Sequence, residues 1–212
     1  MPIYQLSKDL IFPNPLLAED GIIAVGGDLS PERLLLAYRS GIFPWYNEGE
    51  PIIWHAPNPR FVLVPNQLHI SKTLKRLIKQ EKYHYTVNQD FEKVIRHCQQ
   101  VKRYFQDGTW ITNDMENAYI QLHQLGFAHS IEVRNKNNEL LGGLYGLLIG
   151  KVFFGESMFY LESNTSKLAF HYLIENYDLE LIDCQVYTEH LESLGAEEID
   201  VNDFLMLLKE YI

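Results

Sequence analysis

Two long apolar runs joined by a tight turn constrain the fold of this chain more than any other feature. Leu140–Ile149 and Val152–Tyr160 are rich in aliphatic and aromatic residues, and only Gly150 and Lys151 separate them. A two-residue connection containing glycine between such runs is typical of a β-hairpin. The sequence therefore predicts that these runs are adjacent strands of a core hairpin.

One carboxylate lies inside this apolar hairpin. Side chains alternate between the faces of a strand, so Phe154, Glu156 and Met158 are expected on the same face. A carboxylate between two apolar neighbours is costly to bury without a partner. Two interpretations are equally open: a functional site, or a core hairpin with Glu156 at its exposed rim. Glycines weaken strands and indicate bulges or the close approach of another backbone or a ligand, and this hairpin contains four: Gly142, Gly143, Gly146 and Gly155.

Helical and strand patterns interleave along the rest of the chain. Before residue 65 we expect strands at 21–25, 52–54 and 60–64 and a helix at 31–40 that starts at Ser30 and stops at Gly41. After it we expect strands at 83–87, 128–134 and 179–186, and helices at 71–81, 90–102, 114–125, 165–177 and from 201 onwards. This order predicts an α+β fold with a mostly antiparallel sheet. Because the prolines thin out after Pro65, we predict a small N-terminal domain at 1–64 and a second domain at 65–212.

Composition excludes several classes of protein. A chain of 212 residues can bury a substantial core, and no apolar run is long enough to span a bilayer. The N-terminus lacks a signal-peptide pattern, which indicates a cytoplasmic protein that does not act at a membrane. Cys98 and Cys184 are far apart, so we expect reduced thiols. The eight histidines form no metal motif, and we expect no metal ion.

The charge is distributed unevenly. The net charge is −10, yet the segment from Arg60 to Arg103 contains ten basic and three acidic residues, a balance of +7 against −17 elsewhere. A solvated helix face is the ordinary explanation of such a run, but the scarcity of acids favours a patch that faces phosphates. Four of the cations have spacing i, i+3, i+4, i+7 and would share one helix face, which predicts contact with a nucleic-acid backbone: Lys72, Lys75, Arg76 and Lys79.

Three further groups of residues could support chemistry. Asp183 and Gln185 are two apart on a buried strand, where an acid and an amide can jointly hold one small polar group; exposed or capping residues are the alternative. Phe170, Leu173 and Tyr177 form a stripe on one helix face, which suits a core or the floor of a pocket. Two tryptophans are expected to be exposed in loops, where they suit stacking on a base; the alternative is that they anchor their loops to the core: Trp45 and Trp110.

A set of short motifs occurs in order along nearly the whole chain, from about Phe12 to Phe204. Together they resemble leucyl/phenylalanyl-tRNA–protein transferases, although single motifs such as Gly-Gly-Asp are weak. The set comprises Gly26-Gly27-Asp28-Leu29, Phe43-Pro44-Trp45-Tyr46, Thr109-Trp110-Ile111, Gly142-Gly143-Leu144-Tyr145-Gly146, Gly155-Glu156-Ser157-Met158-Phe159, Ser166-Lys167, Asp183-Cys184-Gln185 and Ser193-Leu194-Gly195-Ala196.

The resemblance implies a second domain similar to Gcn5-related N-acetyltransferases. It also implies an enzyme that moves Leu or Phe, and less readily Met, from aminoacyl-tRNA to proteins with N-terminal Arg or Lys and so marks them for degradation by the N-end rule. Leu-tRNA, Phe-tRNA and those proteins would be the partners of a monomer.

The same resemblance assigns residues to roles. It implies that Trp45 and Trp110 flank the terminal adenosine of the tRNA, and that Asp183 and Gln185 are the catalytic pair. Substitutions relative to the best-known members, such as Leu for Met at 144, keep the pocket apolar. The residues that match the amino-acid pocket are Leu144, Glu156, Met158, Phe170, Leu173, Tyr177 and Ile182.

The chemistry would be the attack of an α-amine on an activated ester. We expect Gln185 to position the amine through its amide oxygen and Asp183 to orient that assembly and favour the approaching cation, with a direct base role for Asp183 as the weaker alternative. The ester carries the activation, so no cofactor is expected. Two other functions remain open: an acetyltransferase that uses acyl-CoA, for which the chain lacks a good phosphate-binding turn, and a non-catalytic adaptor for basic N-termini.

Overall fold

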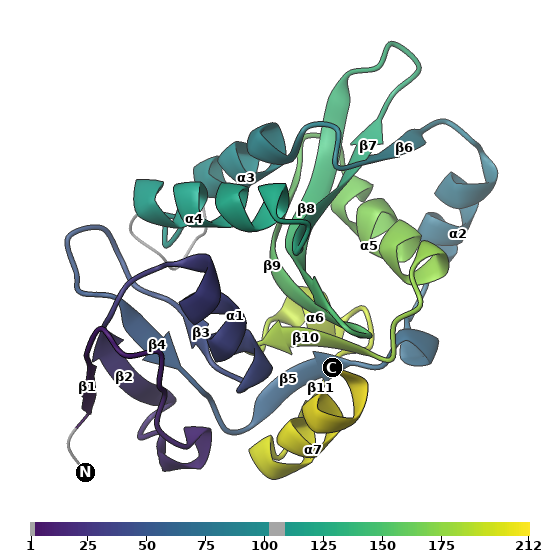
Figure 1. Ribbon diagram of the computed structural model, residues 1–212. Helices are drawn as coiled ribbons and strands as arrows, with labels where there is room; N and C mark the ends of the chain where they lie inside the picture. The colour runs from purple at the N-terminus through teal and green to yellow at the C-terminus, as the bar shows by residue number, and fades with distance from the viewer. Residues whose placement is uncertain (1–2, 102–108) are drawn as a thin grey trace.

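A computed structural model describes residues 3–101 and 109–212, and it contains two β-sheets with helices packed around them (Figure 1). The smaller sheet has the order β1 (Tyr4–Leu6), β2 (Ile22–Gly26), β4 (Ile53–His55) and β3 (Phe43–Pro44). The larger sheet has the order β11 (Glu197–Ile199), β5 (Arg60–Leu63), β10 (Leu181–Gln185), β9 (Val152–Tyr160), β8 (Leu140–Ile149), β7 (Ala128–Arg134) and β6 (His84–Val87).

The helices begin and end close to where the sequence predicts. Ser30 caps α1 (Pro31–Arg39) by accepting a hydrogen bond from the backbone N–H of Arg33, and Gly41 follows that helix with φ +75°. The remaining α-helices are α2 (Lys72–Lys79), α3 (Phe91–Gln100), α4 (Asn113–Gln124), α5 (Thr165–Asn176), α6 (Glu189–Glu192) and α7 (Val201–Tyr211). Two 3-10 turns occupy Pro15–Leu17 and Pro65–Gln67.

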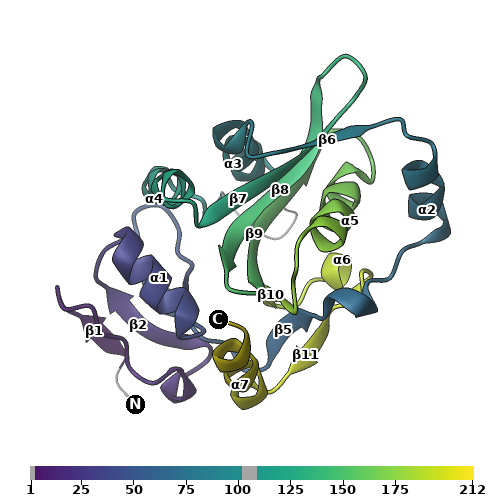
Figure 2. The ribbon, with the colours of Figure 1, turned by 45° about the vertical axis from the view of Figure 1, so that its right-hand side comes forward.

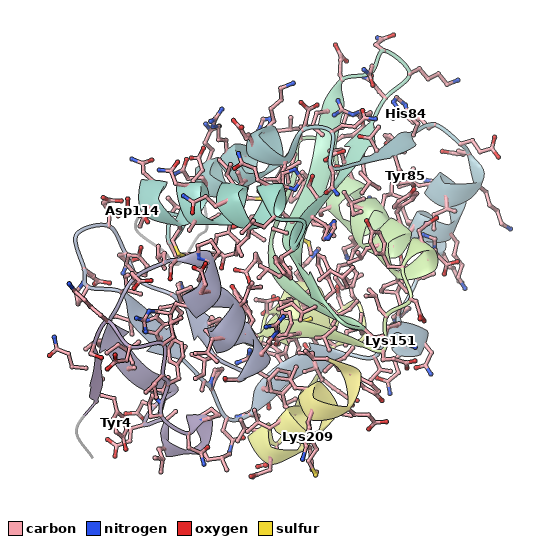
Figure 3. All side chains as sticks on the ribbon, in the orientation of Figure 1. Tyr4, His84, Tyr85, Asp114, Lys151 and Lys209 are labelled. Atoms are coloured by element: carbon pink, nitrogen blue, oxygen red, sulfur yellow. The ribbon has the colours of Figure 1, made fainter. Side chains whose placement is uncertain are left out.

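The larger sheet is covered on both faces. α3 and α4 pack on one face, where the core continues into α1, α7 and the smaller sheet. α5 packs on the other face with α2 outside it, as Figures 1 and 2 show. Tyr85 of β6, labelled in Figure 3, joins strand and helix on that side. Its ring stacks on Tyr172 of α5 at a centroid distance of 4.7 Å. The α+β class is therefore confirmed.

The predicted hairpin is confirmed with its bounds, since β8 and β9 pair antiparallel. The alternation along β9 is interrupted, however. Tyr145 pairs with Ser157 and Gly146 pairs with Gly155, so Glu156 is an extra residue without an opposite on β8. Such a β-bulge re-aims the strand's side chains. The prediction that Met158 shares a face with Phe154 was therefore wrong: the two residues pack into different core clusters.

Two hairpin glycines are required by close approach, as the sequence indicates. A Cβ on Gly142 would lie 2.2 Å from the hydroxyl of Thr165, at the start of α5. A Cβ on Gly146 would lie 2.2 Å from the carbonyl oxygen of Phe154, beside the bulge. These glycines let α5 approach β8 and let the bulged segment of β9 fit against it.

The strand β5 begins where the chain passes from the smaller sheet to the larger one. It pairs with β10 and β11 in the larger sheet, whereas β4, just before it, belongs to the smaller sheet. The predicted boundary after residue 64 would leave β5 with the N-terminal segment. Sheet membership instead places the crossing between His55 and Arg60.

The strands β9 and β10 run side by side for only a short distance. They pair in parallel at Leu181 with Val152, Ile182 with Phe153 and Asp183 with Phe154. Beyond this point β10 ends at Gln185 while β9 continues to Tyr160, so the two strands diverge.

None of the described helices combines the length and apolar character that a bilayer crossing requires. Within residues 3–101 and 109–212, no group of three or more His, Cys, Asp or Glu side chains could hold a metal ion. The side chains of Cys98 and Cys184 are both buried thiols.

Candidate active site

A cavity of about 850 Å³ opens where β9 and β10 diverge. This volume lies within the range of small-molecule sites. Its wall includes β3, the end of α3, the outer half of β9, the start of α5 and the segment from β10 to α6. Eight of the residues singled out from the sequence line it: Trp45, Trp110, Leu144, Glu156, Met158, Phe170, Ile182 and Gln185.

Glu156 contributes the carboxyl group of this wall, although its side chain is only 8% exposed. Its Oε1 accepts hydrogen bonds from Tyr38 Oη at 2.7 Å and from Gln185 Nε2 at 2.9 Å. Its Oε2 accepts one from Tyr119 Oη at 2.9 Å. The bulge in β9 directs the carboxyl group toward these donors from α1, α4 and β10, so the carboxylate is not at an exposed rim.

Burial raises the pKa of Glu156 to about 7. The hydrogen bonds from Tyr38, Tyr119 and Gln185 oppose this shift by stabilising the carboxylate, and the negative charge of Asp183 adds to it. Burial and the nearby Glu156 also raise the pKa of Tyr38 and of Tyr119, so both remain neutral donors. Near neutral pH, Glu156 can therefore be found with or without its proton.

Gln185 has an unusual backbone conformation. Its φ is +65°, which costs an L-residue roughly 1–2 kcal/mol, and the pairing of β10 with β5 is irregular between Asp183 and Gln185. Two contacts hold it: its backbone N–H donates to Asp183 Oδ1 at 2.9 Å, and its side-chain amide nitrogen donates to Glu156. Because the amide nitrogen faces Glu156, the amide oxygen is the atom that can accept a hydrogen bond from a ligand.

Asp183 forms a buried ion pair with Arg60. Arg60 Nε lies 2.8 Å from Oδ1 and Nη2 lies 2.6 Å from Oδ2, and both side chains are almost wholly inaccessible. The guanidinium also lies between the rings of Phe43 and Phe204, at 4.7 and 4.6 Å from their centroids. Asp183 does not line the cavity. It can orient Gln185 through the backbone, but Arg60 rather than a ligand occupies its carboxylate.

Two members of the predicted helix stripe do not reach the cavity. Phe170 lines it, whereas Leu173 is fully buried in the core under α5 and Tyr177 packs against His129 at the far end of the helix. A rise of 1.5 Å per residue places Tyr177 about 10 Å along the axis from Phe170. The shared helix face is real, but only its N-terminal end meets the ligand space.

The two tryptophans differ in exposure. Trp45 is 36% exposed, and its backbone carbonyl lies 2.9 Å from His55 Nε2. Trp110 is buried, with 6% exposure, so the expectation of two exposed loop tryptophans holds for Trp45 alone. Both side chains nevertheless line the cavity.

The basic segment divides into parts. Lys82, Lys93 and Arg96 form ion pairs with acidic side chains, and Arg60 is buried. Lys102 and Arg103 lie outside the described residues. The predicted set on α2 is exposed and, among the described residues, forms no ion pair: Lys72, Lys75, Arg76 and Lys79.

Three residues of the site were not predicted from the sequence: Tyr38, Tyr119 and Arg60. A signal existed for the tyrosines, since a carboxylate predicted to be buried requires donors from somewhere in the fold. Arg60 was counted only as one charge of the basic segment, because nothing local shows that it is buried opposite Asp183.

Both parts of the chain match models of one protein family. The family model described as leucyl/phenylalanyl-tRNA protein transferase matches residues 62–209, and the model of its N-terminal domain matches residues 27–58. The transferase of Flavobacterium johnsoniae is 53% identical over 98% of this chain and 99% of its own length. That of Desulfatibacillum aliphaticivorans is 52% identical over 99% of this chain and 91% of its own length.

A solved GCN5-related N-acetyltransferase from Kribbella flavida aligns with 79% of this chain and 60% of its own, with a TM-score of 0.38 and 10% identity. Together the two family models cover both parts of the chain. The gap between them, residues 59–61, lies where the chain passes from the smaller sheet to the larger one. With about 50% identity to named relatives over nearly its full length, the chain belongs to the leucyl/phenylalanyl-tRNA–protein transferase family.

Proposed function

We propose that this protein transfers Leu or Phe, and less readily Met, from aminoacyl-tRNA to the α-amine of proteins with N-terminal Arg or Lys, marking them for degradation by the N-end rule in the cytoplasm. Its family membership gives the reaction class, an aminoacyl transfer from tRNA to protein. The observation that carries the proposal is the cavity between the diverging strands β9 and β10, which combines an apolar lining with the amide of Gln185.

The cavity suits the aminoacyl end of a tRNA. Leu144, Met158, Phe170 and Ile182 offer an apolar lining for a Leu or Phe side chain. Trp45, at the exposed side, and Trp110 can flank the terminal adenosine, since aromatic rings stack on bases. The side chain and the adenosine would then fix the ester between them.

The reaction needs alignment more than activation. An α-amine has a pKa of about 7.7–8.0, so roughly a tenth to a fifth is already neutral at pH 7. Orientation of amine and ester can lower the barrier by roughly 7–11 kcal/mol. We assign Gln185 to hold the amine through its amide oxygen, and Asp183, fixed by Arg60, to hold Gln185 through its backbone N–H. The acidic balance of the chain outside 60–103 favours a cationic acceptor.

Transfer of labelled Phe from Phe-tRNA to a peptide that begins with Arg is expected to proceed without ATP, CoA or metal, because the ester supplies the activation. Acetyl-CoA with the same peptide is expected to give no product. Peptide labelling measured with and without a chelator tests this. Activity that the chelator abolishes and zinc restores would contradict the proposal. Acetylation of the peptide would favour an acyl-CoA enzyme, and binding without either product would favour an adaptor.

Charge reversal on α2 is expected to weaken tRNA binding and flatten its salt dependence. Lys72→Glu with Lys75→Glu removes two exposed cations from one helix face. Each lost phosphate contact reduces the slope of log K against log salt by about one. Filter binding of Phe-tRNA at several salt concentrations measures the slope.

A matched control carries the same change of charge at other exposed lysines. Lys136 lies in the turn between β7 and β8, and Lys209 lies on α7, away from α2 (Figure 3). Reversing these two to Glu should leave the slope near that of the unmodified protein. An equal slope for both double variants would show that the tRNA does not contact α2.

A further inference from the structure

Three polar groups form a closed ring beside the cavity. Tyr38 Oη contacts Glu156 Oε1 at 2.7 Å, Tyr119 Oη contacts Glu156 Oε2 at 2.9 Å, and the two tyrosine hydroxyls are hydrogen-bonded to each other. Both tyrosines are fully buried and do not line the cavity, whereas Glu156 does. The carboxyl group is thus the point at which the ring meets the ligand space.

Counting protons defines the states of this ring. Each tyrosine hydroxyl has one proton to donate, and an ionised carboxylate has none. With Glu156 ionised, two protons serve three oxygen–oxygen contacts. With Glu156 protonated, three protons serve three contacts, and each hydroxyl donates once and accepts once. The geometry of the ring therefore accommodates one additional proton, and the carboxyl group is where that proton arrives from the cavity.

The other groups around Glu156 indicate where the additional proton can come from. On β10, Gln185 donates its amide N–H to Glu156 Oε1, and the negative Asp183 is paired with Arg60 of β5. On β8, Tyr145 packs edge-on against Tyr119. Among these neighbours the only cation is already paired. A cationic amine held by the amide oxygen of Gln185 would place its N–H groups beside the part of the cavity wall that contains Glu156.

We propose that Glu156 is the proton acceptor of the transfer reaction and that Tyr38 and Tyr119 are its positioning residues; this rests on the proposed function. The acceptor's α-ammonium passes one proton to the carboxylate and becomes an amine. The nitrogen lone pair then forms the bond to the ester carbon, and the bond from carbon to the ribose oxygen breaks. The second proton lost from nitrogen goes to that oxygen, giving a hydroxyl, and Glu156 releases its proton to water.

The acid–base properties of Glu156 suit this role. Its pKa of about 7 is close to the 7.7–8.0 of an α-amine, and a base works best when its pKa lies near the operating pH. Both tyrosines lower the pKa of Glu156 by donating to its carboxylate. Removing either hydroxyl should therefore raise that pKa, so that a higher pH is needed to ionise the base.

The test compares the pH dependence of kcat/KM for transfer from Phe-tRNA to an Arg-initiated peptide in four variants. Glu156→Gln should lower kcat/KM at pH 7 by about five- to tenfold, because only the neutral fraction of the α-amine then reacts, and it should lose the enzyme's inflection, leaving only that of the acceptor amine. Tyr38→Phe and Tyr119→Phe should shift the acidic limb to higher pH and recover activity there. Tyr83→Phe is the control, because that hydroxyl donates to Glu162 at 2.6 Å and should not alter the profile.

A second measurement does not depend on activity. The infrared difference spectrum of the unmodified protein should show a protonated carboxylic acid band that titrates near pH 7 and is missing in Glu156→Gln. Absence of that band, or Glu156→Gln within threefold of the unmodified rate at every pH, would overturn the inference. So would tyrosine variants that lose rate equally at all pH values. Failure of the unmodified protein to transfer Phe at all would instead contradict the proposed function.

Discussion

Replacement of Gln185 by alanine is expected to lower transfer turnover by about a hundredfold to ten-thousandfold while Phe-tRNA binding stays nearly unchanged. The amide is placed to hold the acceptor amine, because its nitrogen is directed to Glu156 and its oxygen can accept from a ligand. The apolar lining and the tryptophans, which would hold the aminoacyl-tRNA, are untouched by the substitution. Single-turnover kinetics and a binding isotherm for Phe-tRNA measure the two quantities separately.

The backbone of Gln185 supplies a sharper form of this experiment. At φ +65°, glycine avoids the cost of roughly 1–2 kcal/mol that an L-side chain incurs. Gln185→Gly should therefore be as inactive as Gln185→Ala but at least as stable. Asn138→Gly is the matched control and should leave transfer unchanged, since Asn138 has the same φ in an exposed turn and does not line the cavity. Near-normal transfer by folded Gln185→Gly would remove this residue from the mechanism.

The parts of the fold that the sequence predicts well are those with a local cause. β8 and β9 were predicted with their bounds because each is a long apolar run that ends at a turn, and β7 because it lies between Gly126 and the turn at 135–138. The short elements β1, β11 and α6 were missed, since three or four residues carry no periodic signal. The position of β5 in the larger sheet was not predicted, because it pairs with residues of β10 more than a hundred positions later in the chain.

The candidate site shows the same division. The resemblance of the motifs brought together most residues of the cavity wall, and the glycines of the hairpin indicated a bulge. Two features of the site depend instead on how α1 and α4 pack over the sheet. They are the face on which the bulge places Met158 and the hydrogen bonds of Tyr38 and Tyr119 to Glu156. Composition likewise counts Arg60 as a surface charge, because only the assembled sheet places it beside Asp183.

Breaking the pair of Arg60 and Asp183 from either side is expected to destabilise the protein by about 3–5 kcal/mol, because the remaining charge is buried without a partner. Arg60→Met and Asp183→Leu should each lower the free energy of unfolding, measured by urea denaturation. Lys82→Met is the control: it breaks an exposed pair with Glu162 and should leave stability nearly unchanged.

The double variant Arg60→Met with Asp183→Leu separates stability from catalysis. Replacing both charges with apolar side chains of similar size is often neutral or stabilising, so the double variant should recover most of the stability that either single variant loses. Its transfer rate should stay low, because the backbone N–H of Gln185 no longer has the Asp183 oxygen that holds it at positive φ. If the double variant were stable and fully active, the ion pair would serve folding alone, and Gln185 would be positioned by Glu156 without help from Asp183.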